Sequence, residues 1–236
     1  MSPNTKIDTL IISDLHLGAP VGKARKVSAL LQNLKFKRLI LLGDILDDAG
    51  FSYLKDTDHQ LLFLIKELSA PQKDLEIVWI SGNHDRHLGN MVSRHTGLKI
   101  KNHFIWEHRG KRFAAIHGDQ FDSFITNNSR VDRFAHSIFL FLQHLDSKGR
   151  HIIKYIDRTN AFIRRLSKKV SSGAIAYARN NQITHIFCGH THLPMQKIHH
   201  DGDSPVHYTN VGCWTHTPST FAVIDDNGDI AIEEIS

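Results

Sequence analysis

Strand-like runs alternate with helical patterns along the first third of the chain, and this alternation limits the fold more than any other feature. Asp8–Ser13, Arg38–Leu42 and Glu76–Ser81 are short, mostly apolar runs typical of buried strands. Between them, Lys23–Leu34 and His59–Leu68 carry apolar residues at three- and four-residue spacing, which predicts helices with one buried face. A strand–helix–strand–helix–strand order predicts an α/β fold with a largely parallel sheet.

The remainder of the chain adds more strand-like runs and no linker. A hairpin is predicted around Arg109–Lys111 and a second one around the Asp226–Asn227–Gly228 turn. The strand-like runs are Phe104–Glu107, Arg112–Ile116, Thr184–Cys188, Phe221–Ile224 and Ile230–Ile235. Because no repeat or low-complexity stretch divides the 236 residues, we predict one domain over residues 1–236.

Residues 121–180 differ from the rest because they lack a strand pattern and are strongly basic. Helices are predicted near Arg130–Leu145, Ile152–Leu166 and Gly173–Asn181. The segment holds eleven Lys and Arg residues against four Asp and no Glu, a balance of +7, whereas the whole chain carries +5. The positive charge is therefore concentrated in one helical insertion.

Five short polar blocks follow predicted strands, and histidine is abundant in them and in the chain as a whole, with 18 residues. The blocks are Asp14-Leu-His16, Gly43-Asp44, Gly82-Asn83-His84-Asp85, His117-Gly118-Asp119 and Gly189-His190-Thr191-His192. Ligands bind at the carboxyl ends of parallel strands, where the loops converge. Carboxylate, imidazole and carboxamide groups without thiolate suit divalent manganese, iron or zinc. The sequence therefore predicts a metal site at this edge of the sheet.

The spacing within the blocks favours more than one cation. Residues two apart in an extended segment share a face, so Asp14 lies beside His16 and His190 beside His192. Asp44 stands between these pairs in the predicted sheet and can bridge two ions. Two neighbouring cations generate hydroxide near neutral pH and neutralise phosphoryl charge, which predicts hydrolysis of a phosphate ester or phosphoanhydride by a metal-bridging hydroxide. Any single block can arise by chance, but five in this order favour a real site.

The ordered series of blocks resembles the calcineurin-like metallophosphoesterase superfamily, and the resemblance covers residues 10–192. It implies a layered sandwich of mixed β-sheets flanked by helices, with residues 121–180 as a helical lid. It also implies two divalent ions, Mn²⁺ before Fe or Zn. One ion would be held by Asp14, His16, Asp44 and His192, and the other by Asp44, Asn83, His117 and His190.

The same resemblance gives His84 a catalytic role, because it leaves this side chain unligated. In the superfamily, the corresponding histidine stabilises or protonates the leaving-group oxygen, and an aspartate three residues after the bridging one orients it. Asp47 occupies that position here. Asn83 and Arg86 are the expected contacts to substrate phosphate.

Within the superfamily, Ser13–Gly18, the chain length and the insertion after His117 resemble the bacterial UDP-2,3-diacylglucosamine pyrophosphohydrolases of lipid A synthesis. This resemblance implies a nucleotide-linked glycolipid substrate, cleaved to UMP and the lipid sugar 1-phosphate. Those enzymes usually carry arginine where this chain has His84. A phosphodiesterase or phosphatase acting on soluble nucleotides is the alternative. A binding scaffold with a decayed site would lack some of the seven ligand positions, and all seven are filled.

Three interpretations of the basic insertion stay open. It can pack as a structural cap, it can cover an anionic and partly apolar substrate or contact an anionic membrane, or it can bind nucleic acid. The last is least favoured, because no aromatic-rich strand motif accompanies the charge. Ile138, Phe139 and Phe141 are the candidate apolar contacts, since Phe139 and Phe141 cannot both face the core.

The location and the remaining polar residues are also constrained. We expect a cytoplasmic protein, with peripheral contact to the inner membrane as an open alternative, because no secretory signal or membrane-length run is present. Cys188 and Cys213 are too few for a disulfide framework, and Cys188 is expected to be a buried thiol. His207 and His216 follow the last block and are expected to return towards the site. The oligomeric state is not predicted.

Overall fold

We describe the protein from a computed structural model. The described residues are 6–47, 53–70, 74–122, 153–200 and 204–236, with backbone only for residues 153–162. The predicted helix Arg130–Leu145 and the candidate contacts Ile138, Phe139 and Phe141 lie outside them.

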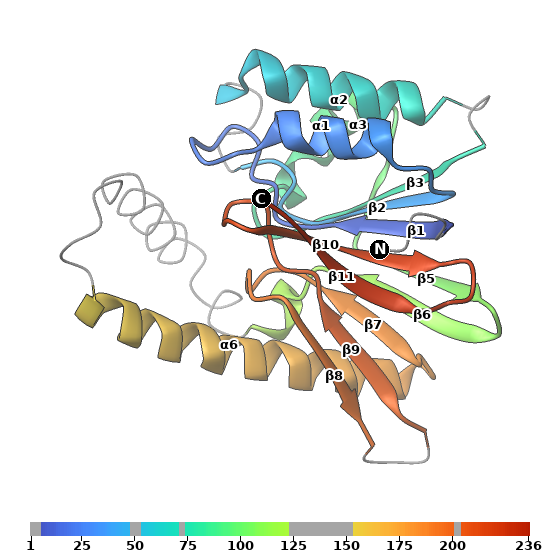
Figure 1. Ribbon diagram of the computed structural model, residues 1–236, viewed down its shortest axis with the longest axis vertical. Coiled ribbons are helices and arrows are strands. Elements are labelled where there is room, and N and C mark those ends of the chain that lie inside the picture. The colour runs from blue at the N-terminus through green and yellow to red at the C-terminus, as the bar shows by residue number, and fades with distance from the viewer. Residues whose placement is uncertain (1–5, 48–52, 71–73, 123–152, 201–203) are drawn as a thin grey trace.

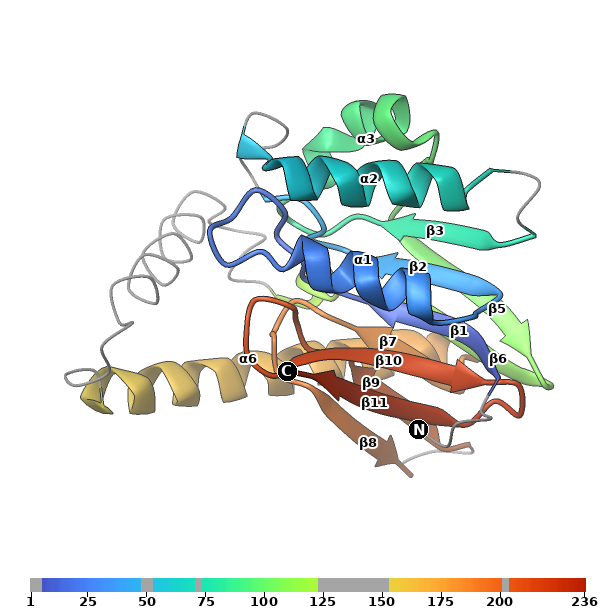
Figure 2. The same ribbon diagram turned by 45° about the horizontal axis from the view of Figure 1, so that its top comes forward.

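The first sheet contains the predicted parallel strands at its centre. Its order is β11-β10-β1-β2-β3-β4, with β1, β2, β3 and β4 parallel and β10 and β11 antiparallel at one side. The strands are β1 (Ile7–Ile12), β2 (Arg38–Leu42), β3 (Glu76–Ile80), β4 (Ile100–Lys101), β10 (Ser219–Asp225) and β11 (Ile230–Ile235). The C-terminal hairpin thus completes the sheet that the N-terminal strands begin, as Figure 2 shows.

The second sheet is built from the middle of the chain in the order β5-β6-β7-β9-β8. Its strands are β5 (His103–His108), β6 (Lys111–Ile116), β7 (His185–Cys188), β8 (Met195–His199) and β9 (Val206–Asn210). The predicted hairpin forms β5 and β6, and β6, β7 and β9 are parallel. Both sheets are therefore mixed, as the α/β sandwich prediction requires.

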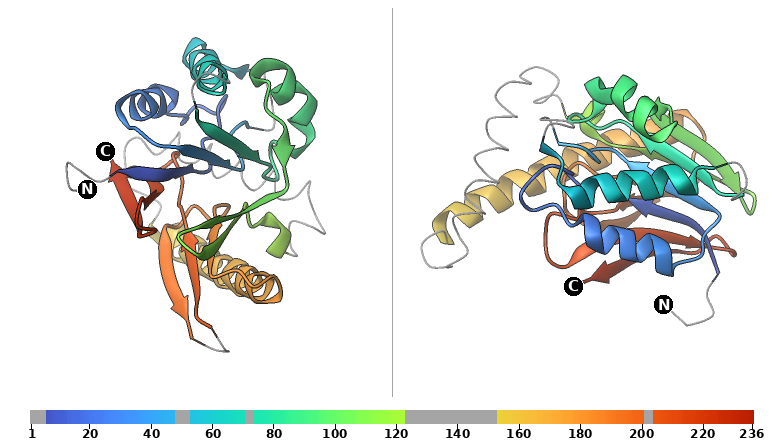
Figure 3. Two further views of the ribbon diagram at one scale, coloured as in Figure 1. Left: turned by 90° about the vertical axis from the view of Figure 1, so that its right-hand side faces the viewer. Right: turned by 90° about the horizontal axis from the view of Figure 1, so that it is seen from above.

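Alternation of side chains along the strands creates separate apolar layers. In β2, Leu39 and Leu41 pack under the helices, whereas Ile40 and Leu42 pack between the two sheets. The helices α1 (Ala24–Asn33), α2 (Asp56–Leu68) and α3 (Gly89–Thr96) cover the outer face of the first sheet (Figure 1). The helix α6 (Ile153–Asn180) covers the outer face of the second, so the order is helix, sheet, sheet, helix (Figure 3).

The second half of the basic insertion differs from its prediction. The structure has one continuous helix, α6, where two helices, Ile152–Leu166 and Gly173–Asn181, were predicted. Gly173 lies inside the helix, and its missing side chain makes room for Phe121, whose Cβ would lie 2.7 Å from a Cβ at residue 173. Val170, Ala174 and Ala178 recur every fourth residue and bury the helix against the second sheet. No helix among the described residues is long and apolar enough to cross a membrane.

Candidate metal centre

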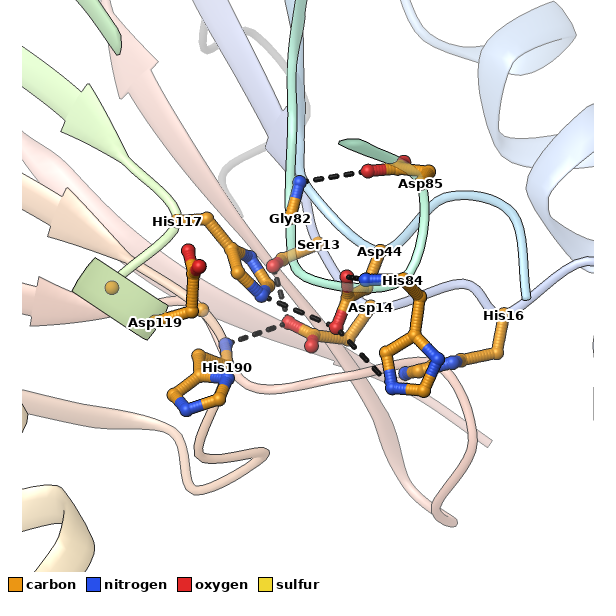
Figure 4. Close-up of polar contacts among 12 residues, drawn as sticks. Ser13, Asp14, His16, Asp44, Gly82, His84, Asp85, His117, Asp119 and His190 are labelled. Atoms are coloured by element: carbon orange, nitrogen blue, oxygen red, sulfur yellow. Dashed lines mark hydrogen bonds and ion pairs between the residues drawn. The ribbon is translucent and has the colours of Figure 1, made fainter. Parts of the chain in front are cut away.

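The five polar blocks converge at one edge where the two sheets meet. Asp14, Asp44 and Asn83 follow β1, β2 and β3 of the first sheet, and His117 and His190 follow β6 and β7 of the second. Figure 4 shows the carboxylates of Asp14 and Asp44 at the centre, with His117 and His190 on one side and His16 and His84 on the other. The structure thus brings the residues of all five predicted blocks together.

The backbone of the predicted ligands is unusual. Eight described residues other than glycine have a positive φ angle, and five of them are predicted metal ligands. These five are Asp14, His16, Asp44, His190 and His192, with φ between 46° and 67°. Left-handed backbone is costly for residues with a Cβ, and such conformations cluster at functional sites. The turns therefore aim these side chains at a geometry that ordinary strand ends would not give.

Glycines beside the ligands make room for the close packing of the site. A Cβ at Gly82 would lie 2.1 Å from Oδ1 of Asp44, and a Cβ at Gly43 would lie 2.3 Å from Nδ1 of His117. A Cβ at Gly189 would lie 2.4 Å from Oδ2 of Asp14. The Gly–ligand pairs seen in the sequence therefore have a steric cause, since any larger residue would displace a ligand.

One group of ligand atoms comes from Asp14, His16 and His192, which lie within 4.8 Å of one another. Oδ2 of Asp14 accepts hydrogen bonds from the Ser13 hydroxyl and from the backbone N–H of His190, the latter at 3.1 Å. Oδ1 remains, 3.1 Å from Nε2 of His192. Burial raises the pKa of Asp14, but His192 outweighs it and brings the pKa to about 2.

A second group comes from Asp44, His117 and His190, also within 4.8 Å of one another. Nδ1 of His117 lies 3.0 Å from the carbonyl oxygen of Leu42, so it donates there and leaves Nε2 as the ligand atom. That Nε2 lies 3.2 Å from Oδ2 of Asp44. Burial lowers the pKa of His117, but Asp44 more than offsets this and raises it to about 10.

Buried polar atoms without hydrogen bonds show that the donor set fits divalent cations. Among the buried side-chain atoms that make no well-aligned hydrogen bond within the described part of the chain are Asp14 Oδ1, Asn83 Oδ1, His117 Nε2 and His190 Nε2. A buried polar atom left in this way is costly unless a bound group such as a metal ion satisfies it. Carboxylate, carboxamide and imidazole atoms in two adjoining groups are suitable ligands for two borderline or hard divalent ions.

His84 and Asp47 form a third group that includes His16, and its ligand atoms also lie within 4.8 Å of one another. Nδ1 of His84 lies 3.3 Å from Oδ1 of Asp47, and the His84 ring is buried. Burial raises the pKa of Asp47, but hydrogen bonds to His16 and His84 reverse this and hold it far below its ordinary range. The two side chains are therefore adjacent, and their roles as acid and orienting carboxylate stay predictions.

Arg86 is the predicted phosphate contact, and the structure pairs it with the last residue of the fourth block. Its guanidinium is half-exposed and pairs with the buried carboxylate of Asp119, the last residue of the His-Gly-Asp block. The Asp119 carboxylate therefore holds the Arg86 guanidinium next to the fourth block, while part of the arginine side chain stays open to solvent.

Several supporting residues were not assigned a role from the sequence. Asp85 accepts three hydrogen bonds, from Gly82 N at 2.7 Å, Ile45 N at 3.0 Å and Trp79 Nε1 at 3.3 Å, and so fixes the turn that carries Asn83 and His84. Its place at the end of the Gly-Asn-His-Asp block is the signal that could have marked it.

Three further side chains adjoin the ligands. Oδ2 of Asp122 lies 3.6 Å from Nε2 of His190, and Asp122 is buried at the start of the insertion. Cys213 and His216 group with His192, within 4.8 Å of one another. Burial raises the pKa of the Cys213 thiol, but His192 and His216 outweigh it and lower the pKa to about 5. His207 was expected to return towards the site together with His216, but it stacks on His185, with ring centroids 4.4 Å apart.

Comparison with known proteins agrees with this geometry. The sequence profile of the calcineurin-like phosphoesterase family matches residues 7–194. A UDP-2,3-diacylglucosamine hydrolase of Blochmanniella pennsylvanica is 27% identical over 244 residues, covering 95% of both chains. An enzyme of the same name from Porphyromonas gingivalis is 30% identical over 117 residues, covering 46% of this chain and 44% of its own.

Two solved structures share the fold. A novel archaeal phosphodiesterase superposes with a TM-score of 0.52 at 16% identity, covering 96% of this chain and 99% of that one. YfcE, a phosphoesterase from E. coli, superposes with a TM-score of 0.51 at 15% identity, covering 97% and 99%. With the matched profile and the convergent ligand set, the chain belongs to the calcineurin-like phosphoesterase family and is a metal-dependent phosphoester hydrolase.

Proposed function

We propose that the chain uses two divalent cations that share Asp44 to hydrolyse a phosphoanhydride. The position of Asp44 carries the proposal. Its Oδ2 lies 3.2 Å from Nε2 of His117 in its own ligand group and 3.9 Å from Nε2 of His84. The His84 ring in turn packs on His16 of the other ligand group, with ring centroids 4.8 Å apart, so the carboxylate adjoins both groups. Burial raises the pKa of Asp44, but His117 and His84 hold it well below its ordinary value, so the carboxylate is ionised and able to bridge.

Different residues of the chain would then have different roles in the reaction. When bound, two cations would lower the pKa of water and neutralise phosphoryl charge. His84 would donate a proton or hydrogen bond to the departing oxygen from Nε2, since its Nδ1 is directed to Asp47. Asn83 and Arg86 would contact the non-bridging phosphate oxygens. Manganese is the expected ion, because the donors of both groups are oxygen and nitrogen.

UDP-2,3-diacylglucosamine is the substrate that we propose, with UMP and the lipid sugar 1-phosphate as products. The names of the two curated relatives support it. The helix α6 adds physical support, because its Ser167 hydroxyl donates to Thr191 of the last ligand block at 3.0 Å. On that stretch of α6, Arg164 and Lys168 are exposed on the flank of the helix nearest Ser167, whereas Arg165 and Lys169 are exposed on the opposite face. A pyrophosphate beside the metals would therefore meet a cationic surface.

The lid and the membrane contact are parts of the same proposal. Residues 121–180 would cover the substrate as an insertion in a single domain spanning residues 1–236. Ile138, Phe139 or Phe141 would contact acyl chains, and the exposed cations of α6 would suit an anionic membrane surface. Each buried methylene contributes up to about 0.8 kcal/mol, so acyl contacts could dominate affinity.

Substitution of the bridging residue tests the chemistry. Asp44→Ala should lose both cations and several orders of magnitude in turnover, whereas purified wild type should hold about two ions per chain. Metal analysis and a chromogenic diester assay measure this. Near-normal turnover in Asp44→Ala, or a fully active preparation free of metal, would overturn the two-cation mechanism.

Paired substrates test the specificity. UDP-2,3-diacylglucosamine should be cleaved at least ~10-fold more efficiently than the unacylated nucleotide sugar, because apolar burial lowers its barrier. Phe139→Ala or Phe141→Ala should reduce that ratio and leave turnover of a small chromogenic diester unchanged. Equal rates on both nucleotide sugars would favour the soluble-nucleotide alternative.

A further inference from the structure

A cysteine and two histidines lie together beside the proposed catalytic cations, and the proposed mechanism uses only one of them. Ligand atoms of His192, Cys213 and His216 lie within 4.8 Å of one another. Cys213 is buried and His216 is partly exposed, so the group has a closed side and an open side. Cys213 belongs to none of the five ligand blocks.

The loop that carries this group is fixed at several points. Residues 211–218 connect β9 to β10, and the backbone N–H of Trp214 donates to the carbonyl of Asp14 at 3.2 Å. The N–H of Thr220 donates to the carbonyl of Cys213 at 3.1 Å, and the Lys23 ammonium binds the carbonyl of His216. These contacts fix the backbone of the loop, so the fold holds Cys213 next to the predicted ligands.

His192 can serve both groups because it has two ring nitrogens. Nε2 lies 3.1 Å from Oδ1 of Asp14, on the side of the catalytic group. Nδ1 lies 3.5 Å from the Thr215 hydroxyl, which itself donates to the sulfur of Cys213 at 3.3 Å. The ring thus separates an oxygen-rich position from a sulfur-containing one.

We propose that Cys213, His192 and His216 form a second kind of metal site, for a thiophilic divalent cation such as Zn²⁺ or Cd²⁺, and that its occupation inhibits hydrolysis. One thiolate and two imidazoles are a nitrogen–sulfur ligand set that zinc favours, whereas manganese prefers oxygen. Binding releases the thiol proton to solvent, and the metal–sulfur bond replaces the S–H bond.

Inhibition follows from the shared imidazole. A cation bound to Cys213 would draw His192 away from Asp14 or lower the basicity of its Nε2, and either change weakens the catalytic group. This part of the inference rests on the proposed two-cation function. The existence of the sulfur site does not, so binding and inhibition are tested separately.

Absorption spectroscopy of the Mn²⁺-loaded full chain tests binding. Cd²⁺ or Co²⁺ should produce a thiolate-to-metal charge-transfer band in the ultraviolet, and Cys213→Ser should lose it. Cys188→Ala is the matched control, because Cys188 is a buried thiol in β7 outside this group, and it should keep the band. His216→Asn should weaken binding at least ~10-fold, the usual effect of losing a metal contact. A band that survives Cys213→Ser, or its absence from a wild-type protein that remains folded by circular dichroism, would overturn the site.

Inhibition of turnover tests the consequence. With saturating Mn²⁺ and a chromogenic diester, the Cd²⁺ concentration that halves each variant's own activity should rise at least ~10-fold in Cys213→Ser and stay unchanged in Cys188→Ala. Equal sensitivity of both variants would overturn the inhibitory role. If neither the wild type nor the two variants hydrolyse the diester, the proposed function fails. The charge-transfer result still decides whether the sulfur site exists.

Discussion

Oδ1 of Asp47 lies 3.3 Å from Nδ1 of His84 and 3.6 Å from Nδ1 of His16. One carboxylate therefore orients both a predicted metal ligand and the predicted general acid. Only Nε2 of His84 is left to face a substrate, which makes the role of this residue separable from metal binding.

The first prediction concerns this separation. His84→Ala should keep its metal content but lower kcat by about 10²–10⁴, the range for loss of a general acid. The loss should be smaller for p-nitrophenol esters, because that leaving group needs little protonation. Metal analysis and steady-state kinetics measure both, with the exposed His59→Ala on α2 as control. Loss of a cation from His84→Ala would show that the residue is a ligand.

The second prediction concerns the space beside the bridging carboxylate. Gly82→Ala places a Cβ 2.1 Å from Oδ1 of Asp44, so the carboxylate must move and cation affinity should fall at least ~10-fold. Gly89→Ala is the control, since a Cβ there meets nothing within 4 Å. Calorimetric titration with Mn²⁺ compares the two variants. Equal affinities would show that the close approach at Gly82 does not position Asp44.

The third prediction concerns Asp122, which lies 3.6 Å from Nε2 of His190. Because Nε2 is also the ligand atom assigned to His190, a carboxylate beside it can hold the ring in place or offer an oxygen to the same cation, and loss of such a contact costs roughly 10–100-fold in metal affinity or activity. Asp122→Asn should show a loss of that size, whereas the surface variant Asp226→Asn should not. An unchanged Mn²⁺ affinity in Asp122→Asn would leave this aspartate a purely structural residue.

The fourth prediction concerns pH. Burial, and then His207 and Lys111, lower the pKa of His185 to about 4. Its unfolded value is about 6.5, so the unfolded chain binds the proton more readily. The stabilising contribution is present above about pH 6.5 and is lost as the pH falls towards 4. Wild type should therefore lose more unfolding free energy than His185→Gln between about pH 7 and about pH 5 in urea titrations. Parallel losses would contradict this.

The central strands of the first sheet and the positions of the polar blocks could be predicted because their sequence patterns are local. The apolar runs that became β1, β2 and β3 are each followed directly by a polar block, and the structure places these blocks at one edge. The strands β8 and β9 were not predicted. The exposed, polar pattern of Met195–His199 reflects its position at the edge of a sheet, where one row of backbone groups faces solvent.

The supporting contacts were harder to predict because they depend on tertiary packing. Inside the continuous helix α6, Gly173 leaves space that is occupied by Phe121, 52 positions earlier in the chain. Cys213 lies 21 positions after His192, and only the return of the loop after β9 places its sulfur beside that ring. A single sequence carries no local signal for either contact.

The two ligand groups have a mechanical consequence for the whole domain. Asp14 and His16 follow the first sheet and His192 follows the second, while Asp44 likewise faces His117 and His190 across the same boundary. A cation in either group would bind residues from both sheets and so link the sheets to each other. Part of its binding free energy would then stabilise the packing of the two sheets against each other. Removal of the metals should therefore weaken this packing as well as stop catalysis.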